Sequence, residues 1–549
     1  MPARTVHIET FGCQMNELDS ELVSGRLRAL GYRVVHGPED ADVVLYNTCS
    51  VREHAEQKVW SRLGELKAAK RARPALVVGV LGCLAERDGE ALIRRMPVVD
   101  VLCGPGELDK LPALLDNAVR TRASLLADED APDRRSARQV ALQGSTSRRS
   151  GTLAAAQDTL ELLDLSRSVS PIDADDEHTT RRSAYVRITR GCNKFCTYCV
   201  VPHTRGAEIH RPPDHIVDEC KRLGDAGVVE ITLLGQTVNH YRFEHGAAVT
   251  VAGLVQPQKG RAHAGNGERR RDPLAGANVT TFAALLARIH DEVPAIGRLR
   301  FVTSYPRDFG DDVLEVIRDH PRLCRYLHVP AQSGSDRILR AMNRGYEVAE
   351  YLEFIDRARA HLDEPHNGRP LMLAGDFIVG FPGETDEDFE ASLRLLRRVR
   401  YKNAFIFKYS PRPGTVAFDK LPDDVPEGVK RARNNAMLEA QGAISDEISR
   451  AQVGRTVDVF VEGLSRKERR RQDAPTADRG VALTVSGRRL AQETDDAGEG
   501  VQLSGRTEGD QIVFIDATTD QRAALMGRVV PVRIEHAQGL GLFGRVARA

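Results

Sequence analysis

The sequence lacks several features that would place the protein in a membrane, outside the cell, or on nucleic acid by charge alone. No stretch of its 549 residues reaches the roughly 18 unbroken apolar residues of a membrane-spanning helix. The first residues contain no apolar core of the kind that signal peptides have. The nine cysteines are an odd number without regular disulfide spacing, which favours a reducing cytoplasm. Basic and acidic residues balance at 78 each, so any nucleic-acid surface must be a local patch.

Shifts in composition divide the chain into three folded parts and two polar segments. Residues 1–122 and 183–440 alternate apolar strands with helical stretches, which is typical of parallel α/β architecture. The polar segment 123–182 is predicted to be a linker, and the Gly-, Arg- and Ala-rich segment 243–279 a disordered insertion. Residues 452–549 switch to short β-type runs separated by polar loops, including one at 466–479, and predict a small all-β barrel. Its expected strands are Thr456–Val461, Val481–Val485, Gln511–Ile515 and Val529–Ile534.

A cysteine triplet in the second part is the strongest signal in the chain. Cys192, Cys196 and Cys199 lie on one short segment with CxxxCxxC spacing, and no fourth cysteine is nearby. Iron–sulfur clusters are held by thiolates, usually four, so three thiolates leave one iron open to an outside ligand. A zinc site usually shows paired CxxC or histidine spacings and four ligands, and three buried structural cysteines are the remaining alternative.

A second set of cysteines is expected to converge in the first part. Cys13, Cys49 and Cys83 each follow a strand-like run, and helical sequence separates these runs. Because the carboxyl ends of parallel strands meet at one edge of a sheet, the three thiols should lie together there. Three cysteines so placed favour a metal or cluster site over core packing. Cys103 also follows an apolar run, but it has no matched partner.

The second part is predicted to form a partial TIM-like (β/α)6 barrel with its chemistry at the carboxyl ends of the strands. Glycine-containing turns follow the second, fourth, fifth and sixth expected strands, and such turns can open backbone amides to a nucleoside. Together with the cysteine segment they are interpreted as a cofactor cradle. The expected strands are Tyr185–Thr189, Val229–Leu234, Leu299–Thr303, Tyr326–Val329, Leu371–Val379 and Ala404–Tyr409.

These motifs resemble the methylthiotransferase family of radical S-adenosylmethionine (SAM) enzymes over the whole chain. The triplet, with an aromatic residue before its last cysteine, is similar to the radical SAM signature. Gln14-Met15-Asn16, directly after Cys13, favours the MiaB branch, which makes 2-methylthio-N6-dimethylallyladenosine in tRNA. The other two branches typically have Pro-Lys-Asn or Lys-Val-Asn there. Further MiaB-like motifs are Asn343-Arg344-Gly345-Tyr346 and Tyr409–Thr415, and Leu503–Thr507 resembles the RNA-binding TRAM domain.

The resemblance implies an activity, its cofactors and its partners. It implies two [4Fe–4S] clusters, one on Cys192, Cys196 and Cys199 that cleaves SAM reductively, and an auxiliary one on Cys13, Cys49 and Cys83 that carries or supplies sulfur. Carbon 2 of N6-dimethylallyladenosine, at position 37 beside the tRNA anticodon, would be the target, and a second SAM would donate the methyl group. It also implies a reductant such as flavodoxin or ferredoxin, a cytoplasmic monomer, and no catalytic residue beyond the cysteines. The implied SAM contacts are Tyr198, Gly235, Gln236, Gln332, Ser333, Val379 and Gly380.

Several alternatives stay open at this point. The same chemistry could act on another tRNA adenosine or on a ribosomal protein side chain, and a non-catalytic iron–sulfur RNA-binding protein belongs to a different class. Charge gives little support to RNA binding, because residues 452–549 hold 15 basic against 14 acidic residues. The run Arg466–Arg471 could touch phosphate, although a solvated loop is the simpler interpretation. The tRNA species, the electron donor and the roles of Cys103, Cys220 and Cys324 are not predicted.

Overall fold

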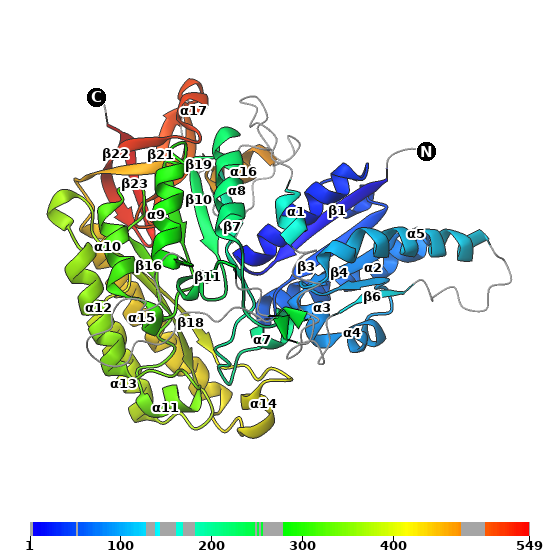
Figure 1. The fold of residues 1–549 in the computed structure, drawn as a ribbon, viewed down its shortest axis with the longest axis horizontal. Coiled ribbons are helices and arrows are strands. Elements are labelled where there is room, and N and C mark those ends of the chain that lie inside the picture. The colour runs from blue at the N-terminus through cyan, green and yellow to red at the C-terminus, as the bar shows by residue number, and fades with distance from the viewer. Residues whose placement is uncertain are drawn as a thin grey trace, which may run out of the picture.

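The computed structural model has three folded units in the order that the sequence predicts (Figure 1). An α/β unit at the N-terminus lies beside a larger barrel, and a small β-barrel at the C-terminus lies against the other end of that larger barrel. None of the helices in the described part of the chain is both long and apolar enough to cross a bilayer. The structure describes residues 4–50, 53–127, 138–142, 161–167, 182–246, 250–251, 254–255, 278–473 and 500–547.

The N-terminal unit is a parallel sheet covered by helices on both faces. Its strand order is β2-β1-β3-β4-β5-β6, and every pair is parallel. Apolar residues of α1 and α5 pack on one face, and those of α2, α3 and α4 pack on the other. The strands are β1 (Thr5–Phe11), β2 (Arg33–Val34), β3 (Val43–Thr48), β4 (Val77–Gly82), β5 (Val101–Cys103) and β6 (Gln139–Ala141); the helices are α1 (Gln14–Ala29), α2 (Glu53–Ala72), α3 (Cys83–Asp88), α4 (Glu90–Arg95) and α5 (Leu111–Ala127).

The segment 123–182 contributes more structure than a linker. Helix α5 continues to Ala127, and β6 adds a sixth strand to the edge of the sheet by pairing with β5. Residues 161–165 are helical, and the buried Leu163 joins the apolar core between the sheet and α1. The piece 161–167 is polar in sequence partly because two of its three buried side chains, Asp164 and Arg167, form ion pairs with the larger barrel.

Six parallel strands form the partial barrel, in sequence order and within a few residues of the predicted positions. Two three-stranded groups, β7-β10-β15 and β16-β17-β18, are joined through a bridge between Leu299 and Leu323. Helices pack outside them around one large apolar core. The strands are β7 (Ser183–Arg187), β10 (Glu230–Leu234), β15 (Arg298–Phe301), β16 (Tyr326–His328), β17 (Met372–Val379) and β18 (Asn403–Lys408); the main helices are α8 (Pro213–Asp225), α9 (Phe282–Glu292), α10 (Asp311–Asp319), α11 (Asp336–Ala341), α12 (Val348–Leu362), α13 (Asp386–Val399), α14 (Val416–Lys420) and α15 (Glu427–Arg450).

The two ends of the predicted insertion 243–279 are ordered and paired. Strand β11 (Arg242–Glu244) forms an antiparallel ladder with β14 (Val279–Thr281). The two ends of the insertion are therefore side by side where it joins the barrel. Within it the structure describes only a short hairpin, β12 (Thr250–Val251) and β13 (Leu254–Val255). The rest of the segment lies outside the described residues.

The C-terminal unit is a closed five-stranded barrel with the strand order β19-β20-β21-β23-β22. The all-β prediction is confirmed. The expected strand Val481–Val485 lies outside the described residues, and the expected loop 466–479 begins with a helix instead of a loop. The elements are β19 (Thr456–Leu464), α16 (Arg466–Asp473), β20 (Gly500–Thr507), β21 (Ile512–Thr518), α17 (Thr519–Leu525), β22 (Val529–Gln538) and β23 (Gly541–Val546).

Buried charges join this small barrel to the amino ends of the larger barrel's strands. Glu230, the first residue of β10, is fully buried and accepts hydrogen bonds from Arg300 Nε at 2.8 Å and Arg506 Nη2 at 3.1 Å. Arg298 donates to the backbone oxygens of Arg506 at 2.7 Å and Asp458 at 2.8 Å. The small barrel is therefore fixed at the end of the larger barrel that lies opposite the carboxyl ends of its strands.

Candidate active site

The three N-terminal cysteines come together at the carboxyl edge of the sheet, as predicted. Cys13 precedes α1, Cys49 follows β3, and Cys83 is the first residue of α3. The backbone approaches closely here: a Cβ on Gly12, whose φ is +143°, would lie 2.6 Å from Cys49 Cβ. Hydrogen bonding to Cys49, helped by the charge of Arg205, lowers the pKa of Cys13 to about 6. Of the three thiols, Cys13 is thus the one whose neighbours favour ionisation.

Two buried asparagines hold the loops that carry these cysteines. Cys13 Sγ donates to Asn16 Oδ1 at 3.2 Å, and Asn16 Nδ2 donates to Asn47 Oδ1 at 3.0 Å. Asn47 in turn donates to the Asn16 backbone oxygen at 2.9 Å. Asn16 stands in the motif after Cys13 that carries the family resemblance, but sequence reasoning gave neither asparagine a role. Asn16 lies three residues after Cys13 and Asn47 two residues before Cys49, and this proximity was the available signal.

An arginine from the larger barrel reaches into this site. Arg205 follows α7 (Val201–Thr204) and donates to Asp19 Oδ2 of α1 at 2.9 Å. Burial raises the pKa of Cys83, and the Arg205 charge and a hydrogen bond from Thr204 oppose that rise. The same arginine acts on Cys13. Because α7 begins two residues after Cys199, one short segment connects the two cysteine sets.

The second set lies on the loop between β8 (Thr189–Arg190) and α7, at the mouth of the larger barrel. All three cysteines are half-buried. Burial, followed by the mutual repulsion of the other two thiols, raises the pKa of Cys199, and burial followed by Glu208 raises that of Cys192 to about 11. The loop thus places three half-buried thiols from one short segment at the barrel mouth.

Two polar side chains that sequence reasoning missed contact this triad. Arg344 Nη1 donates to Cys196 Sγ at 3.4 Å, and Thr237 Oγ1 lies 3.7 Å from Cys192 Sγ. Arg344 is buried and its guanidinium also lies over the ring of Tyr305, 4.7 Å from the centroid. A fixed positive charge beside a thiolate set favours its ionised form.

The predicted SAM contacts lie around the same mouth, and they differ in whether their polar atoms already have hydrogen-bond partners. Tyr198 lies in the triad loop and packs edge-on against Phe381 at 6.5 Å between centroids. Gly235 and Gln236 directly follow β10, and Gln236 Oε1 is buried without a hydrogen-bond partner among the described residues. Val379 ends β17. Gln332 sits at φ +69°, a strained backbone position of the kind that occurs at ligand sites.

Two of the predicted contacts are already engaged in holding the loops. The Ser333 hydroxyl lies 3.3 Å from that of Ser392 and accepts from the Ser335 backbone N–H at 3.2 Å. The Gly380 N–H donates to Glu384 Oε2 at 2.6 Å. These groups shape the mouth, and a cofactor would find their polar atoms occupied.

The remaining three cysteines are core residues. Cys103, Cys220 and Cys324 are buried at 4% exposure or less. Cys103 Sγ donates to the Glu107 backbone oxygen at 3.2 Å, and burial holds the pKa of each of the three thiols above its usual value. They explain why nine cysteines yield only two triads.

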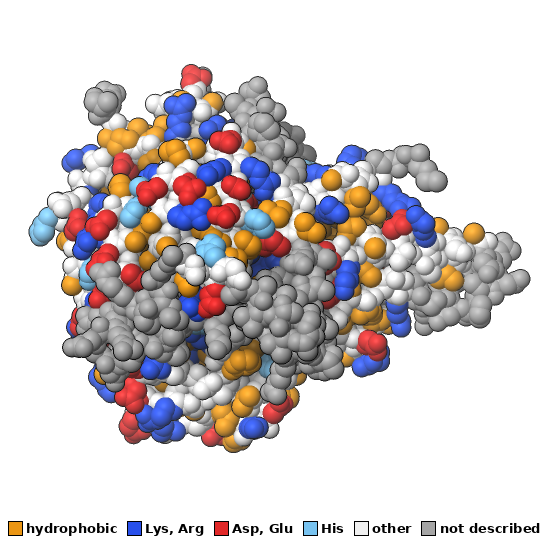
Figure 2. All heavy atoms as spheres, viewed as in Figure 1, with side chains coloured by type: hydrophobic (Ala, Val, Ile, Leu, Met, Phe, Trp, Pro, Cys, Tyr) orange, Lys and Arg blue, Asp and Glu red, His pale blue; other side chains and the backbone are white. Residues whose placement is uncertain are grey.

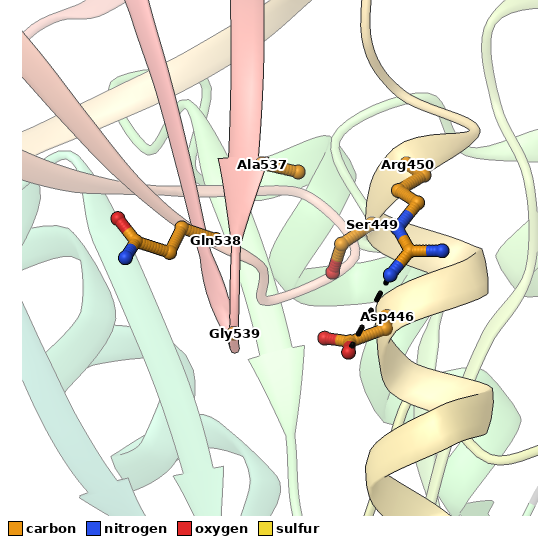
Figure 3. Close-up of a pocket in the computed structure, with 6 residues that line it drawn as sticks. All are labelled: Asp446, Ser449, Arg450, Ala537, Gln538 and Gly539. Carbon is orange, nitrogen blue, oxygen red and sulfur yellow. Dashed lines mark ion pairs between the residues drawn. The ribbon is translucent and has the colours of Figure 1, made fainter.

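The charge pattern and the hollow described next do not point to a further functional site. On the face drawn in Figure 2, basic and acidic side chains alternate, in line with the zero net charge. A small hollow between α15 and the β22–β23 turn is lined by Ser449, Ala537, Gln538, Gly539 and the Asp446–Arg450 ion pair at 3.9 Å (Figure 3). It bears none of the cysteines or predicted SAM contacts.

The donor chemistry of both triads fits an iron–sulfur cluster with one open iron. Each triad offers thiol sulfur only, the ligand type that such clusters require. The positive side chains beside them, Arg205 and Arg344, complement the negative charge that thiolates carry. The glycine turns and the half-buried loop leave the triad at the barrel mouth accessible to a cofactor.

Comparison with known proteins agrees with this geometry. Residues 5–104 match the model of the uncharacterized protein family UPF0004, and residues 186–396 match that of the radical SAM superfamily. A tRNA-2-methylthio-N(6)-dimethylallyladenosine synthase of Rhodopirellula baltica is 41% identical over 545 residues, covering 99% of this chain and 95% of the relative. The chain belongs to the tRNA-2-methylthio-N(6)-dimethylallyladenosine synthase family.

Other members of the synthase family match at similar levels. The Anaeromyxobacter dehalogenans synthase is 37% identical, covering 100% of this chain and 95% of the relative, and the Burkholderia multivorans synthase is 36% identical, covering 99% and 97%. Among solved structures, a radical S-adenosylmethionine methyltransferase, TsrM, from Kitasatospora setae aligns with a TM-score of 0.48 at 14% identity, covering 84% of this chain and 79% of that one. The family predicted from the motifs is confirmed.

Proposed function

We propose that this protein methylthiolates carbon 2 of N6-dimethylallyladenosine at position 37 of tRNA. The observation that carries the proposal is the 41% identity to a named synthase over 99% of the chain. The two thiol triads of the structure support it, because sulfur insertion followed by methylation needs one site for SAM cleavage and another for sulfur. Sequence-specific RNA recognition favours single-stranded loops, and the anticodon loop is such a substrate.

In this proposal the two triads hold separate clusters. Cys192, Cys196 and Cys199 would bind the [4Fe–4S] cluster that also takes SAM, and Cys13, Cys49 and Cys83 would bind the auxiliary one. When bound, the first cluster supplies the electron that cleaves SAM, chemistry that side chains alone do not perform. Tyr198, Gln332, Val379 and the residues after β10 would position SAM, with Gln236 as the polar group that is open to it.

The chain's own residues supply position and charge. Arg344 and Thr237 hold two of the triad's sulfurs in place at the mouth. Arg205, held by its hydrogen bond to Asp19, places a positive charge near the N-terminal triad. These contacts join the N-terminal unit to the loop that carries the second triad.

Partners and location follow from this chemistry as further parts of the proposal. The protein acts in the cytoplasm, where tRNA is modified, and a small electron carrier such as flavodoxin or ferredoxin is the reductant. One chain contributes both triads, so a monomer suffices.

Serine replacements separate the two triads. The variant with Cys13, Cys49 and Cys83 all changed to Ser should keep about half of the parent's iron, since hydroxyl is a poor ligand for cluster iron. It should still release 5′-deoxyadenosine from SAM and form no methylthiolated tRNA. The corresponding variant at Cys192, Cys196 and Cys199 should do neither. Cys103→Ser is the matched control, because Cys103 also ends a strand of the same sheet and should leave iron and product unchanged.

The substrate is tested with the reconstituted enzyme and two tRNA samples. Mass spectrometry of nucleosides should show the methylthio group on tRNA that already carries dimethylallyladenosine, and nearly none on tRNA without it. Equal turnover of a ribosomal protein would contradict the proposal. So would full iron and full product in the Cys13, Cys49 and Cys83 variant.

A further inference from the structure

A buried group of two histidines and a glutamate lies behind the cysteine triad of the larger barrel. His210 is on β9 (Ile209–His210), which pairs with β8, and Glu208 lies just before that strand. His240 ends the helical turn Val238–His240 that follows β10. One ligand atom from each side chain lies within 4.8 Å of the other two. Two separate loops thus bring three metal-binding groups together.

The polar atoms of this group are only partly satisfied. Glu208 and His210 are each 1% exposed and His240 is 9% exposed. Glu208 Oε1 lies 2.8 Å from His240 Nδ1 and 3.9 Å from His210 Nε2. Glu208 Oε2 and both ring nitrogens of His210 have no hydrogen-bond partner among the described residues. Buried polar atoms without partners are costly and rare, so an unpartnered imidazole facing a carboxylate calls for a ligand.

We propose that Glu208, His210 and His240 bind a zinc ion, separate from the iron–sulfur clusters. Two imidazoles and a carboxylate are a ligand set of known zinc sites, with bonds near 2.0–2.2 Å and a fourth position left for water. Ligand atoms of a tetrahedral zinc site stand about 3.4 Å apart. The 2.8 Å spacing would therefore open slightly and the 3.9 Å spacing would close slightly around the ion. Lys194 and Arg242 act electrostatically on this group, and each has an acidic partner of its own. Lys194 pairs with Asp308 at 2.7 Å, and Arg242 pairs with Glu244 at 2.5 Å.

The position of the site indicates a supporting role for the cysteine loop. The Glu208 backbone N–H donates to Asn193 Oδ1 at 3.1 Å, and Asn193 follows Cys192 directly. A zinc ion would cross-link this segment to the loop after β10, which carries Gly235, Gln236 and Thr237. The ion would therefore fix the backbone behind the triad without contacting the reacting atoms.

Zinc content and zinc coordination test the proposal on the full chain with its clusters in place. Protein produced with added zinc is passed over a chelating resin, and zinc and iron per chain are measured by mass spectrometry. We expect about one zinc in the parent, and His210→Ala should lower its affinity at least about tenfold with iron retained. His366→Ala, an exposed histidine elsewhere in the larger barrel, is the matched control and should keep the zinc.

X-ray absorption at the zinc edge keeps the test independent of the variant's folding. The parent should show nitrogen and oxygen neighbours at about 2.0–2.2 Å and no sulfur near about 2.3 Å. Three results would overturn the proposal: no zinc in the parent, sulfur in the zinc shell, or zinc retained in folded His210→Ala. Failure here leaves the proposed tRNA activity untouched, because that activity is measured by product and iron.

Discussion

Asp19 joins the N-terminal unit to the larger barrel, and its replacement by asparagine should loosen that junction. Asp19 lies on α1 with 1% exposure and accepts hydrogen bonds from two arginines of the barrel. Arg187 Nη1 donates to Oδ1 at 2.8 Å, and Arg205 Nη2 donates to Oδ2 at 2.9 Å. Asparagine keeps the shape but loses the charge, and its amide would point N–H groups at a guanidinium.

The size of the effect follows from which charges lose their partner. Removing one member of a buried ion pair costs about 3–5 kcal/mol because it leaves the other charge uncompensated. Arg187 keeps Asp164, whose Oδ1 is 2.5 Å away, whereas Arg205 loses its aspartate. We therefore expect about 3 kcal/mol, which is a little over a hundredfold in the equilibrium for opening the junction.

Hydrogen exchange read by mass spectrometry measures this opening. Peptides from α1 and from residues 200–206 should exchange about a hundredfold faster in Asp19→Asn, while peptides from the small β-barrel should not change. Asp319→Asn is the control, since Asp319 is exposed and pairs only locally with Arg318 at 2.7 Å. Exchange within twofold of the parent at both peptides would refute the reasoning that the junction depends on these charges.

Two further changes test the mouth and the outer helices. Gly191→Ala should lose only the iron bound by the adjacent triad Cys192, Cys196 and Cys199, because at φ +68° the added Cβ would lie 2.1 Å from the Ala207 backbone oxygen. Gly428→Ala is the control and should keep all its iron, because no atom lies within 4 Å of its added Cβ. Unchanged iron in both variants would contradict this prediction. Burial would raise the pKa of Asp388, but hydrogen bonds from Ser335, Arg337 and Thr385 lower it to about 2. The ionised Asp388 carboxylate stabilises the folded state fully above its unfolded-state pKa of about 3.9, and this stabilisation is lost as the pH falls toward about 2. The gap between parent and Asp388→Asn urea midpoints should therefore narrow over that range, and a constant gap would disprove the link.

The strands and the cysteine triads could be predicted because their signals are local. Buried parallel strands are apolar runs, so all six barrel strands are found within a few residues of the expected positions. A cysteine directly after such a run must lie at the carboxyl edge of the sheet. Cys13, Cys49 and Cys83 are therefore placed by topology alone, without knowledge of any side-chain contact.

The contacts between the units could not be predicted, because their partners are distant in sequence. Arg187 and Asp19 are 168 residues apart, and nothing in the sequence pairs these two charged side chains. Strand β6 has three residues and depends on pairing with β5. Ser333 and Gly380 stand where the cofactor cradle was expected, yet neighbouring loops use their polar groups. Which polar group a neighbouring loop uses depends on three-dimensional packing, which the sequence pattern does not reveal.

The helix α16 changes how the charge of the C-terminal unit is interpreted. The run Arg466–Arg471 is nearly the whole of this helix, and Glu468 is buried, with its backbone N–H bonded to Ser465 Oγ at 3.2 Å. Arg466, Lys467, Arg469 and Arg471 are exposed. A unit with 15 basic and 14 acidic residues thus presents a local positive ridge, which suits contact with phosphate.

Changing Arg466, Lys467 and Arg469 to glutamine should therefore weaken tRNA binding and its dependence on salt. If each side chain neutralises one phosphate, the slope of log affinity against log salt should fall by about 2. The loss should be similar for tRNA with and without the dimethylallyl group, because phosphate contacts carry no information about the base. The control replaces Arg394, Arg397 and Arg398, which are exposed on α13 and change the net charge equally. An equal loss in both triple variants would show that only overall charge matters. A slope unchanged in the α16 variant would place the phosphate contacts elsewhere and leave the helix as an ordinary solvated surface.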